Sequence, residues 1–426
     1  MHARVHPLWS KARKAALVCA ALLLHPLQFA SAEAEDVLLP GDVAVSSFAG
    51  VKLQTEALPP NVDPVTKTVI DPDGITLTIF NAANVPLSGA GTQLNLPMRL
   101  NFTARQLGHV FPLAYDMLPP DERGTPGLYA GATSAFGLNI VGPDGDEDGM
   151  PDRISAGAPG ASFMEGQFGP SADGGAGAIW KIDQATGQLS LYAEIKNSGP
   201  GLGGLAFDPA SRTFYASDLD TGVIVHLGGA ATGNGLGQFD HGVDARPLGG
   251  KTAVPDDGRL LDISSPQFNS ADPATWGSTQ IERRVDALAV HGGRLYYAAA
   301  DGPEIWSVGL GPDGGFQEDA RIEFAVPLLL PGTVTAITFD GEGRMLLAIR
   351  NAPQNTGDFV ALTASGPSDV MRFTPESPDD PQTPFAWLPD AEFYGTGNAP
   401  EHRDASGGVA LQYAYKPDGT LDLSSC

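Results

Sequence analysis

Residues 205–216 read Leu-Ala-Phe-Asp-Pro-Ala-Ser-Arg-Thr-Phe-Tyr-Ala, which predicts a short apolar strand, a turn and a second apolar strand. Asp and Pro favour the turn, and the aromatic and small apolar triplets on either side favour strands. The same pattern returns four more times along the chain. The copies are 113–116 with 128–130, 288–290 with 295–298, 337–340 with 345–348, and 409–411, near the last residue. Repetition of one short antiparallel unit predicts a radial β architecture.

Further strands are expected within each copy, because apolar and polar residues alternate there as they do in half-buried strands. Third strands are expected at 179–182, 224–227, 305–308 and 370–373, and fourth strands at 189–192, 321–324 and 385–388. Four antiparallel strands per unit make the blade of a β-propeller. The sequence therefore predicts an all-β fold, a β-propeller of four-stranded antiparallel blades, with five blades countable and six or seven if the insertions hold more.

The copies divide the chain into three parts. Residues 33–104 hold N-terminal β strands, which we expect to close the ring, and residues 105–426 form the propeller. Gly-, Pro- and Asp-rich insertions are expected at about 137–177 and 228–284, the second with a possible degenerate blade at 260–263. The last copy is short, so the alternative is that strands beyond Cys426 complete it.

The first part, residues 1–32, is a predicted signal peptide. Its start is basic, residues 15–24 are apolar, and Ala30-Ser31-Ala32 is a small-x-small cleavage signal. The apolar run is too short to span a membrane. The sequence therefore predicts a secreted or periplasmic protein without a membrane span.

The net charge of −25 limits the choice of partners. Residues 1–32 hold four basic and no acidic residues, so the remainder has 21 basic against 50 acidic residues, a net charge of −29. Such a surface repels nucleic acid and favours cations or basic partners. Only Cys426 remains after cleavage, so no intrachain disulfide can form.

The blade motifs resemble those of a broad group of secreted propellers. Residues 205–209 and 214–218, with their copies, are similar to segments of NHL-repeat proteins, gluconolactonase-like enzymes and strictosidine-synthase-like proteins. The resemblance covers the chain from about residue 105 onward. It implies the propeller fold and matches no single family, so it does not assign an activity.

Residues 144–152 read Asp-Gly-Asp-Glu-Asp-Gly-Met-Pro-Asp, which predicts a calcium site. Calcium takes six to eight oxygen ligands, and alternating Asp in a Gly-containing turn supplies several of them from one loop. The loop resembles EF-hand-like and thrombospondin-type calcium loops, but Ser155 stands where an EF-hand has its bidentate Glu, so we expect weak binding. The alternative is a solvated acidic loop. The expected ligands are Asp144, Asp146, Asp148, the Met150 carbonyl and Asp152.

The sequence holds no HExxH pair and no GxSxG elbow. Lactonase-like propellers hold a metal with carboxylate and amide side chains at the mouth of the central channel, and Glu165, Asp218 and Asp286 flank strands that could reach such a mouth. The leading hypothesis is a secreted or periplasmic non-catalytic propeller that binds a small-molecule ligand or protein partner, with a calcium-stabilised loop. The alternative is a metal-dependent hydrolase of the lactonase or phosphoesterase type. Three or more carboxylates or amides at the channel mouth would favour the enzyme, and a wall of Gly, Ala and Thr would favour binding.

Overall fold

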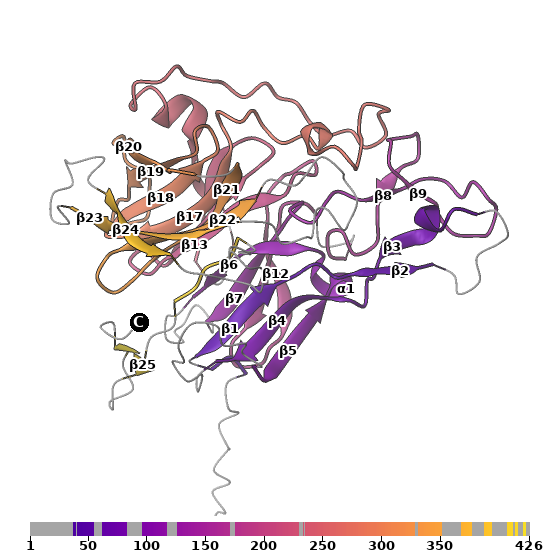
Figure 1. Ribbon diagram of the computed structural model, residues 1–426, viewed down its shortest axis with the longest axis horizontal. Coiled ribbons are helices and arrows are strands. Elements are labelled where there is room, and N and C mark those ends of the chain that lie inside the picture. Colours follow the sequence, from indigo (N-terminus) through magenta and orange to yellow (C-terminus); the bar gives the residue numbers. More distant parts are fainter. Residues whose placement is uncertain are drawn as a thin grey trace, which may run out of the picture. The chain divides into compact units, whose positions relative to one another are not determined.

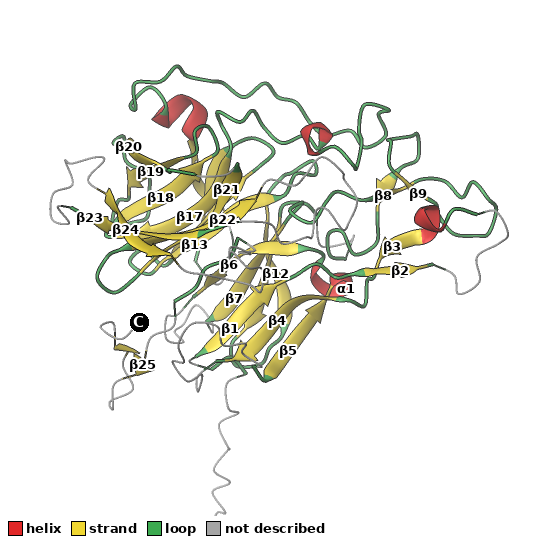
Figure 2. Cartoon of the chain, viewed as in Figure 1, coloured by secondary structure: helices red, strands yellow, loops and turns green. Residues whose placement is uncertain are grey.

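The computed structural model describes residues 37–39, 41–54, 62–82, 96–116, 126–170, 175–229, 233, 235–328, 331–351, 368–376, 387–393, 407–411, 414–415 and 421–422. The predicted signal peptide, residues 1–32, lies outside these residues. Strands dominate the described part, and the helices are single short turns (Figure 2). None of the described helices is long and apolar enough to cross a membrane.

The predicted four-stranded antiparallel blades are confirmed, with four complete blades among the described residues (Figure 1). Each blade is a meander of consecutive strands, except that an insertion separates the second and third strands of the first blade. The first two blades are β6 (Val110–Tyr115), β7 (Gly127–Ala132), β11 (Ala178–Asp183) and β12 (Leu189–Glu194), then β13 (Leu202–Asp208), β14 (Thr213–Asp218), β15 (Val223–Leu227) and β16 (Gly235–Asp240).

The other two blades follow along the chain, and they complete the pattern expected from the repeats. They are β17 (Val285–His291), β18 (Arg294–Ala299), β19 (Glu304–Gly309) and β20 (Arg321–Ala325), then β21 (Gly332–Phe339), β22 (Met345–Asn351), β23 (Val370–Pro375) and β24 (Trp387–Phe393). The expected third and fourth strands are present; of the segment 385–388, residues 387 and 388 are described, and they begin β24.

The hydrophobic core lies between successive blades, because each blade buries both faces. All six residues of β14 are buried, as are all six of β7. Tyr129 of β7 and Phe214 of β14 meet across one such interface, with ring centroids 4.2 Å apart. Phe324 of β20 and Phe373 of β23 meet across another, at 4.5 Å. Buried aromatic pairs of this kind stabilise the stacking of blade on blade.

The N-terminal strands form a sheet of their own. The sheet has the order β1 (Asp42–Ser46), β4 (Ile75–Asn81) and β5 (Met98–Thr103), and no described strand of the last copy pairs with it. Residues 409–411 of that copy are described without strand structure. Two short strand pairs are β2 (Val51–Leu53) with β3 (Thr68–Ile70) and β25 (Ala414–Tyr415) with β26 (Leu421–Asp422). A small three-stranded sheet has β8 (Ile140–Val141) between β9 (Arg153–Ile154) and β10 (Ser162–Phe163).

The two expected insertions lie against one another. Ala156 of the first insertion forms an antiparallel bridge with Asn269 of the second, and Phe268 and Trp276 of the second join the core of the first blade. The second insertion contains strand β16, which completes the second blade, whereas residues 260–263 form no strand. Short helical turns in and beside these regions are α1 (Ala104–Leu107), η1 (Pro64–Lys67), η2 (His241–Ala245) and η3 (Pro273–Thr275).

A buried arginine anchors the second insertion. The fully buried Arg283 guanidinium donates to Asp240 Oδ2 at 2.8 Å and to the carbonyl oxygens of Thr221 and Val254 at 2.7 Å each. Its partners therefore come from the end of β16, from the turn before β15 and from the insertion itself. Burial of a cation with this many acceptors holds the three segments together.

Candidate functional site

A pocket of about 420 Å³ lies where the first strands of the four blades come together, and we call it the central channel. It is surrounded by six segments of the chain, which are the first strands of the four blades, strand β1 and residues 407–410. Four of these segments belong to complete blades, so the expected count of five, six or seven blades stays a prediction. The wall is mainly apolar, with Val43, Leu113, Leu205, Leu288 and Ile337 among its side chains.

Every first strand of the four blades has a β-bulge near its beginning. The register shifts between Val110 and Leu113 in β6, between Leu202 and Leu205 in β13, between Val285 and Ala287 in β17, and between Val334 and Ala336 in β21. A bulge bends its strand and changes the direction of the side chains beside it. The bulged residues are Phe111 and Pro112, Gly203 and Gly204, Asp286, and Thr335, of which Phe111, Pro112, Gly204 and Thr335 line the channel.

Gly203 and Gly204 allow two first strands to approach closely. A Cβ atom on Gly204 would lie 2.6 Å from the Leu288 amide nitrogen and 2.9 Å from the Ala287 carbonyl carbon. A Cβ on Gly203 would overlap the Val285 carbonyl oxygen. Since backbone cannot move aside as a flexible side chain can, only glycine fits at this contact between β13 and β17.

The hydroxyl groups of the channel wall are used to join neighbouring segments. Thr335 Oγ1 donates to the Gly407 carbonyl at 2.7 Å, and Ser46 Oγ lies 3.4 Å from the Phe111 carbonyl that it donates to. No carboxylate, amide or imidazole side chain is found among the described lining residues. A ligand in the channel would therefore contact mainly apolar side chains and glycine backbone of the described wall.

An aromatic cluster lies behind the wall at the bulged end of β6. The His109 ring is 5.2 Å from Phe48 and 5.6 Å from Phe136, and Phe136 is 6.2 Å from the channel-lining Phe111. His109 is fully buried and neither ring nitrogen has a hydrogen-bond partner, so burial lowers its pKa to about 3. The Arg350 guanidinium lies over the Phe111 and Phe136 rings, at 5.6 and 5.4 Å.

The three residues expected at a channel mouth lie apart from the channel lining. Glu165 is exposed and pairs with Arg105. Asp218 is buried at the end of β14, where it accepts hydrogen bonds from Asn197 Nδ2 and Thr221 Oγ1 at 2.6 Å each, and burial raises its pKa in spite of them.

Asp286, the third of these residues, is the bulged residue of β17. Its carboxylate lies 3.2 Å from Arg284 Nε, its Oδ2 atom is buried without a hydrogen-bond partner, and burial raises its pKa. It does not line the channel, and neither does Glu165 or Asp218. The structure thus does not gather these three carboxylates into one site.

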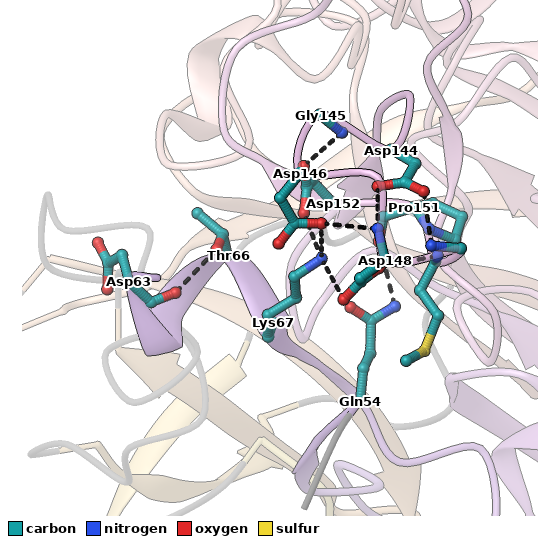
Figure 3. Close-up of polar contacts among 12 residues, drawn as sticks. Gln54, Asp63, Thr66, Lys67, Asp144, Gly145, Asp146, Asp148, Pro151 and Asp152 are labelled. Carbon is teal, nitrogen blue, oxygen red and sulfur yellow. Dashed lines mark hydrogen bonds and ion pairs between the residues drawn. The ribbon is translucent and has the colours of Figure 1, made fainter. Parts of the chain in front are cut away.

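The acidic loop contains a feature that the sequence did not reveal, an internal ammonium group (Figure 3). Lys67, at the end of η1, is fully buried, and its Nζ lies 3.0 Å from Asp146, 2.9 Å from Asp148 and 2.7 Å from Asp152. Burial by itself would lower the pKa of Lys67, but the three carboxylates outweigh it and raise the pKa well above its usual range. The same ammonium holds the pKa values of Asp148 and Asp152 below the usual range of an aspartate carboxyl group.

Asp144 and Met150, the other expected ligands, take part in hydrogen bonds that fix the turn of the loop. Asp144 accepts hydrogen bonds from the amides of Asp148 and Gly149 at 3.1 and 2.7 Å, and the Met150 amide donates to Asp148 at 2.9 Å. Oxygens of Asp144, Asp146 and Asp152 lie within 4.8 Å of one another, a spacing that suits a shared cation. The loop therefore contains a potential cation site at which the Lys67 ammonium would compete with a bound cation.

Comparisons with known proteins found structural similarities at low sequence identity. No protein-family model and no curated protein matches the chain. It is similar to a chain of a nidogen/laminin complex, with 13% identity and a TM-score of 0.32 over 70% of this chain and 69% of that one. It is similar to a gluconolactonase from Xanthomonas campestris, with 14% identity and a TM-score of 0.29 over 64% of this chain and 61% of that one. It is also similar to a luciferin-regenerating enzyme, with 13% identity and a TM-score of 0.34 over 72% of each chain.

The blades and their shared channel define a β-propeller protein. The TM-scores of the similar structures are all below 0.5, so the choice between binding and catalysis depends on the site itself.

Proposed function

We propose that the protein is an exported, non-catalytic propeller that binds an uncharged, largely apolar ligand, or an apolar side chain of a partner, in its central channel. The observation that supports this proposal is the composition of the described channel wall, which consists of apolar side chains and glycine, together with the already engaged hydroxyls of Ser46 and Thr335. A charged ligand would lose its hydration there without a partner, whereas an apolar one gains by burial. The volume of about 420 Å³ suits a small molecule.

Gly408 provides a direct test. It lines the channel, its backbone φ is not in the left-handed region, and a Cβ atom there meets nothing within 4 Å. Gly408→Leu should therefore fill the channel without disturbing the fold. Gly235→Leu is the matched control, since Gly235 is equally open but lies on the outer strand β16.

The assay is a fluorescence titration with N-phenyl-1-naphthylamine, an uncharged apolar dye. The wild type and Gly235→Leu should bind the dye with equal affinity, and Gly408→Leu should bind it at least about tenfold more weakly, a loss of about 1.4 kcal/mol. Equal binding by all three proteins would show that the dye does not enter the channel and would contradict the proposal.

The competing function is a metal-dependent hydrolase of the lactonase or phosphoesterase type, and the observation in its favour is the buried, partly unpartnered carboxylate of Asp286. Hydrolysis of lactones and phosphoesters should be screened with and without calcium on the wild type and on Asp286→Asn. Turnover that depends on calcium and is lost in Asp286→Asn would replace the binding proposal.

We also propose that the 144–152 loop takes up calcium in competition with the Lys67 ammonium. The spacing of the Asp144, Asp146 and Asp152 oxygens supports a cation there, and the predicted signal peptide agrees with a calcium-rich environment. Because the ammonium must move, we expect weak binding, on the order of 10⁻⁴ to 10⁻³ M. Calorimetry should detect calcium binding by the wild type and its loss in Asp146→Ala. No heat of binding up to several tens of millimolar, well above that range, would refute the calcium site.

A further inference from the structure

Strand β16, Gly235–Asp240, is the outermost strand of the second blade, and its sequence is Gly-Leu-Gly-Gln-Phe-Asp. It pairs with β15 on one side, and no other strand in the described part of the chain pairs with its outer side. Its first four residues are exposed, and Leu236 is 57% exposed. It is thus an accessible sheet edge with an apolar side chain on it, and such an edge can accept another strand.

The outer strands of the other three blades are protected, which sets β16 apart. The edge of β12 lies against Gly228 and Gly233, since Tyr192 Oη donates to the Gly228 carbonyl and a Cβ on Gly233 would overlap the Tyr192 backbone. Strand β20 carries the ion pair between Arg321 and Glu323, and β24 contains a proline at position 389. Charges and proline prevent the addition of a strand. The only charge on β16 is Asp240 at its end, and Arg283 neutralises it at 2.8 Å.

The glycines of β16 leave an open position at the end of an aromatic row. The row crosses three strands, because Tyr215 lies opposite His226 and His226 lies opposite Gly237. The Tyr215 and His226 rings stack, with centroids 4.9 Å apart and planes within 13°. A Cβ at Gly237 or Gly235 would meet nothing within 4 Å. A large aromatic side chain on a neighbouring strand can lie over such an edge glycine and extend the row.

We propose that β16 is a docking edge for an extended segment of a partner protein, which adds to the second blade as a fifth strand. The segment carries an aromatic residue opposite Gly237, and Lys or Arg at its flanks. The basic flanks follow from the net charge of −25, which attracts a cationic segment and makes two copies of this chain repel each other. Backbone hydrogen bonds to the edge provide affinity, and the open glycine positions provide specificity.

The test uses the full chain and a fluorescent peptide of sequence Lys-Thr-Val-Tyr-Val-Thr-Lys with blocked ends. Leu236→Lys places a charge on the edge without removing a buried contact, and Leu248→Lys is its charge-matched control on an equally exposed leucine outside the strands, at 54% exposure. Fluorescence anisotropy should show binding by the wild type and by Leu248→Lys, and at least about tenfold weaker binding by Leu236→Lys. A peptide with proline in place of one valine should not bind.

Hydrogen exchange gives a second readout that does not depend on charge. Addition of the peptide should protect backbone amides of residues 235–239 and leave the channel strands unchanged. Equal affinity of Leu236→Lys and Leu248→Lys, or binding of the proline peptide, would overturn the proposal. A concentration-dependent dimer that is lost in Leu236→Lys would overturn it too, because the occupant would then be a second copy. None of these results depends on a ligand in the channel.

Discussion

Lys67→Met is the most informative single change, because it removes the only cation seen between Asp146, Asp148 and Asp152 among the described residues. Methionine keeps the apolar stem of the side chain and removes its charge. Removal of one partner from a buried ion pair costs about 3–5 kcal/mol. The three carboxylates are 18–28% exposed and retain some hydration, so we expect the lower end of that range, about 3 kcal/mol of unfolding free energy at pH 7.

Lys52→Met is the matched control. Lys52 is 41% exposed, and its Nζ lies 3.4 Å from Asp71 and 3.7 Å from Asp73, so the change should cost about 0–1 kcal/mol. Urea denaturation at pH 7 measures both. A loss in Lys67→Met no greater than that in Lys52→Met would refute the role assigned to the buried ammonium.

The pH dependence provides an independent check. The pKa values of Asp148 and Asp152 are lowered in the folded state, so their contribution is present above the unfolded pKa of about 3.9 and is lost as the pH falls through the folded values. The pKa of Lys67 is raised, so its contribution is complete below about pH 10.4 and is lost only at higher pH. The deficit of Lys67→Met should therefore be constant near neutrality and shrink below about pH 4. A deficit that persists in acid would show that lost packing, and not lost charge, causes it.

Calcium should distinguish the two cations that compete for this loop. Added at about 10⁻² M, above the weak extracellular range, calcium should stabilise Lys67→Met more than the wild type, because the variant has no ammonium to displace. Stabilisation of both proteins to the same extent would place calcium elsewhere on the chain.

Three further changes test other parts of the structure. His109→Phe should raise the free energy of unfolding, and more at pH 5 than at pH 7.5. The folded pKa of His109 is about 3, so the wild type loses about 1.4 kcal/mol of stability for each pH unit below 6.5. A stability difference between the two proteins that does not change with pH would contradict this. Gly204→Ala should lower the melting temperature by several degrees through its overlap with backbone, on the scale of about 1–3 kcal/mol, whereas Gly235→Ala should have little effect. Arg283→Met should lower the free energy of unfolding by about 3 kcal/mol and make the second insertion sensitive to protease, whereas Arg259→Met, at an exposed arginine, should do neither. If protease leaves the second insertion intact in both variants, Arg283 does not anchor it.

The repeated strand pairs could be identified from the sequence because strand formation depends on local alternation. Apolar residues at 205–207 and 214–216, with a turn between them, form β13 and β14, and the copies behave alike except for the one at 409–411, which is described without strand structure. Strand β16 was missed because Gly-Leu-Gly-Gln-Phe-Asp has neither β-branched residues nor a regular alternation, and only its pairing with β15 makes it a strand.

The sequence by itself determined the blade, the acidic loop and the charge of the protein, since each of these depends on neighbouring residues or on a simple count. Only the tertiary structure decided what surrounds the channel, because six segments between residues 43 and 410 meet there and no local pattern records which of their residues turn inward. It likewise placed Lys67 against Asp146, 79 positions further along the chain. Contacts between distant segments depend on how the blades close into a ring, and for that reason the composition of the site could not be read from any single stretch of the sequence.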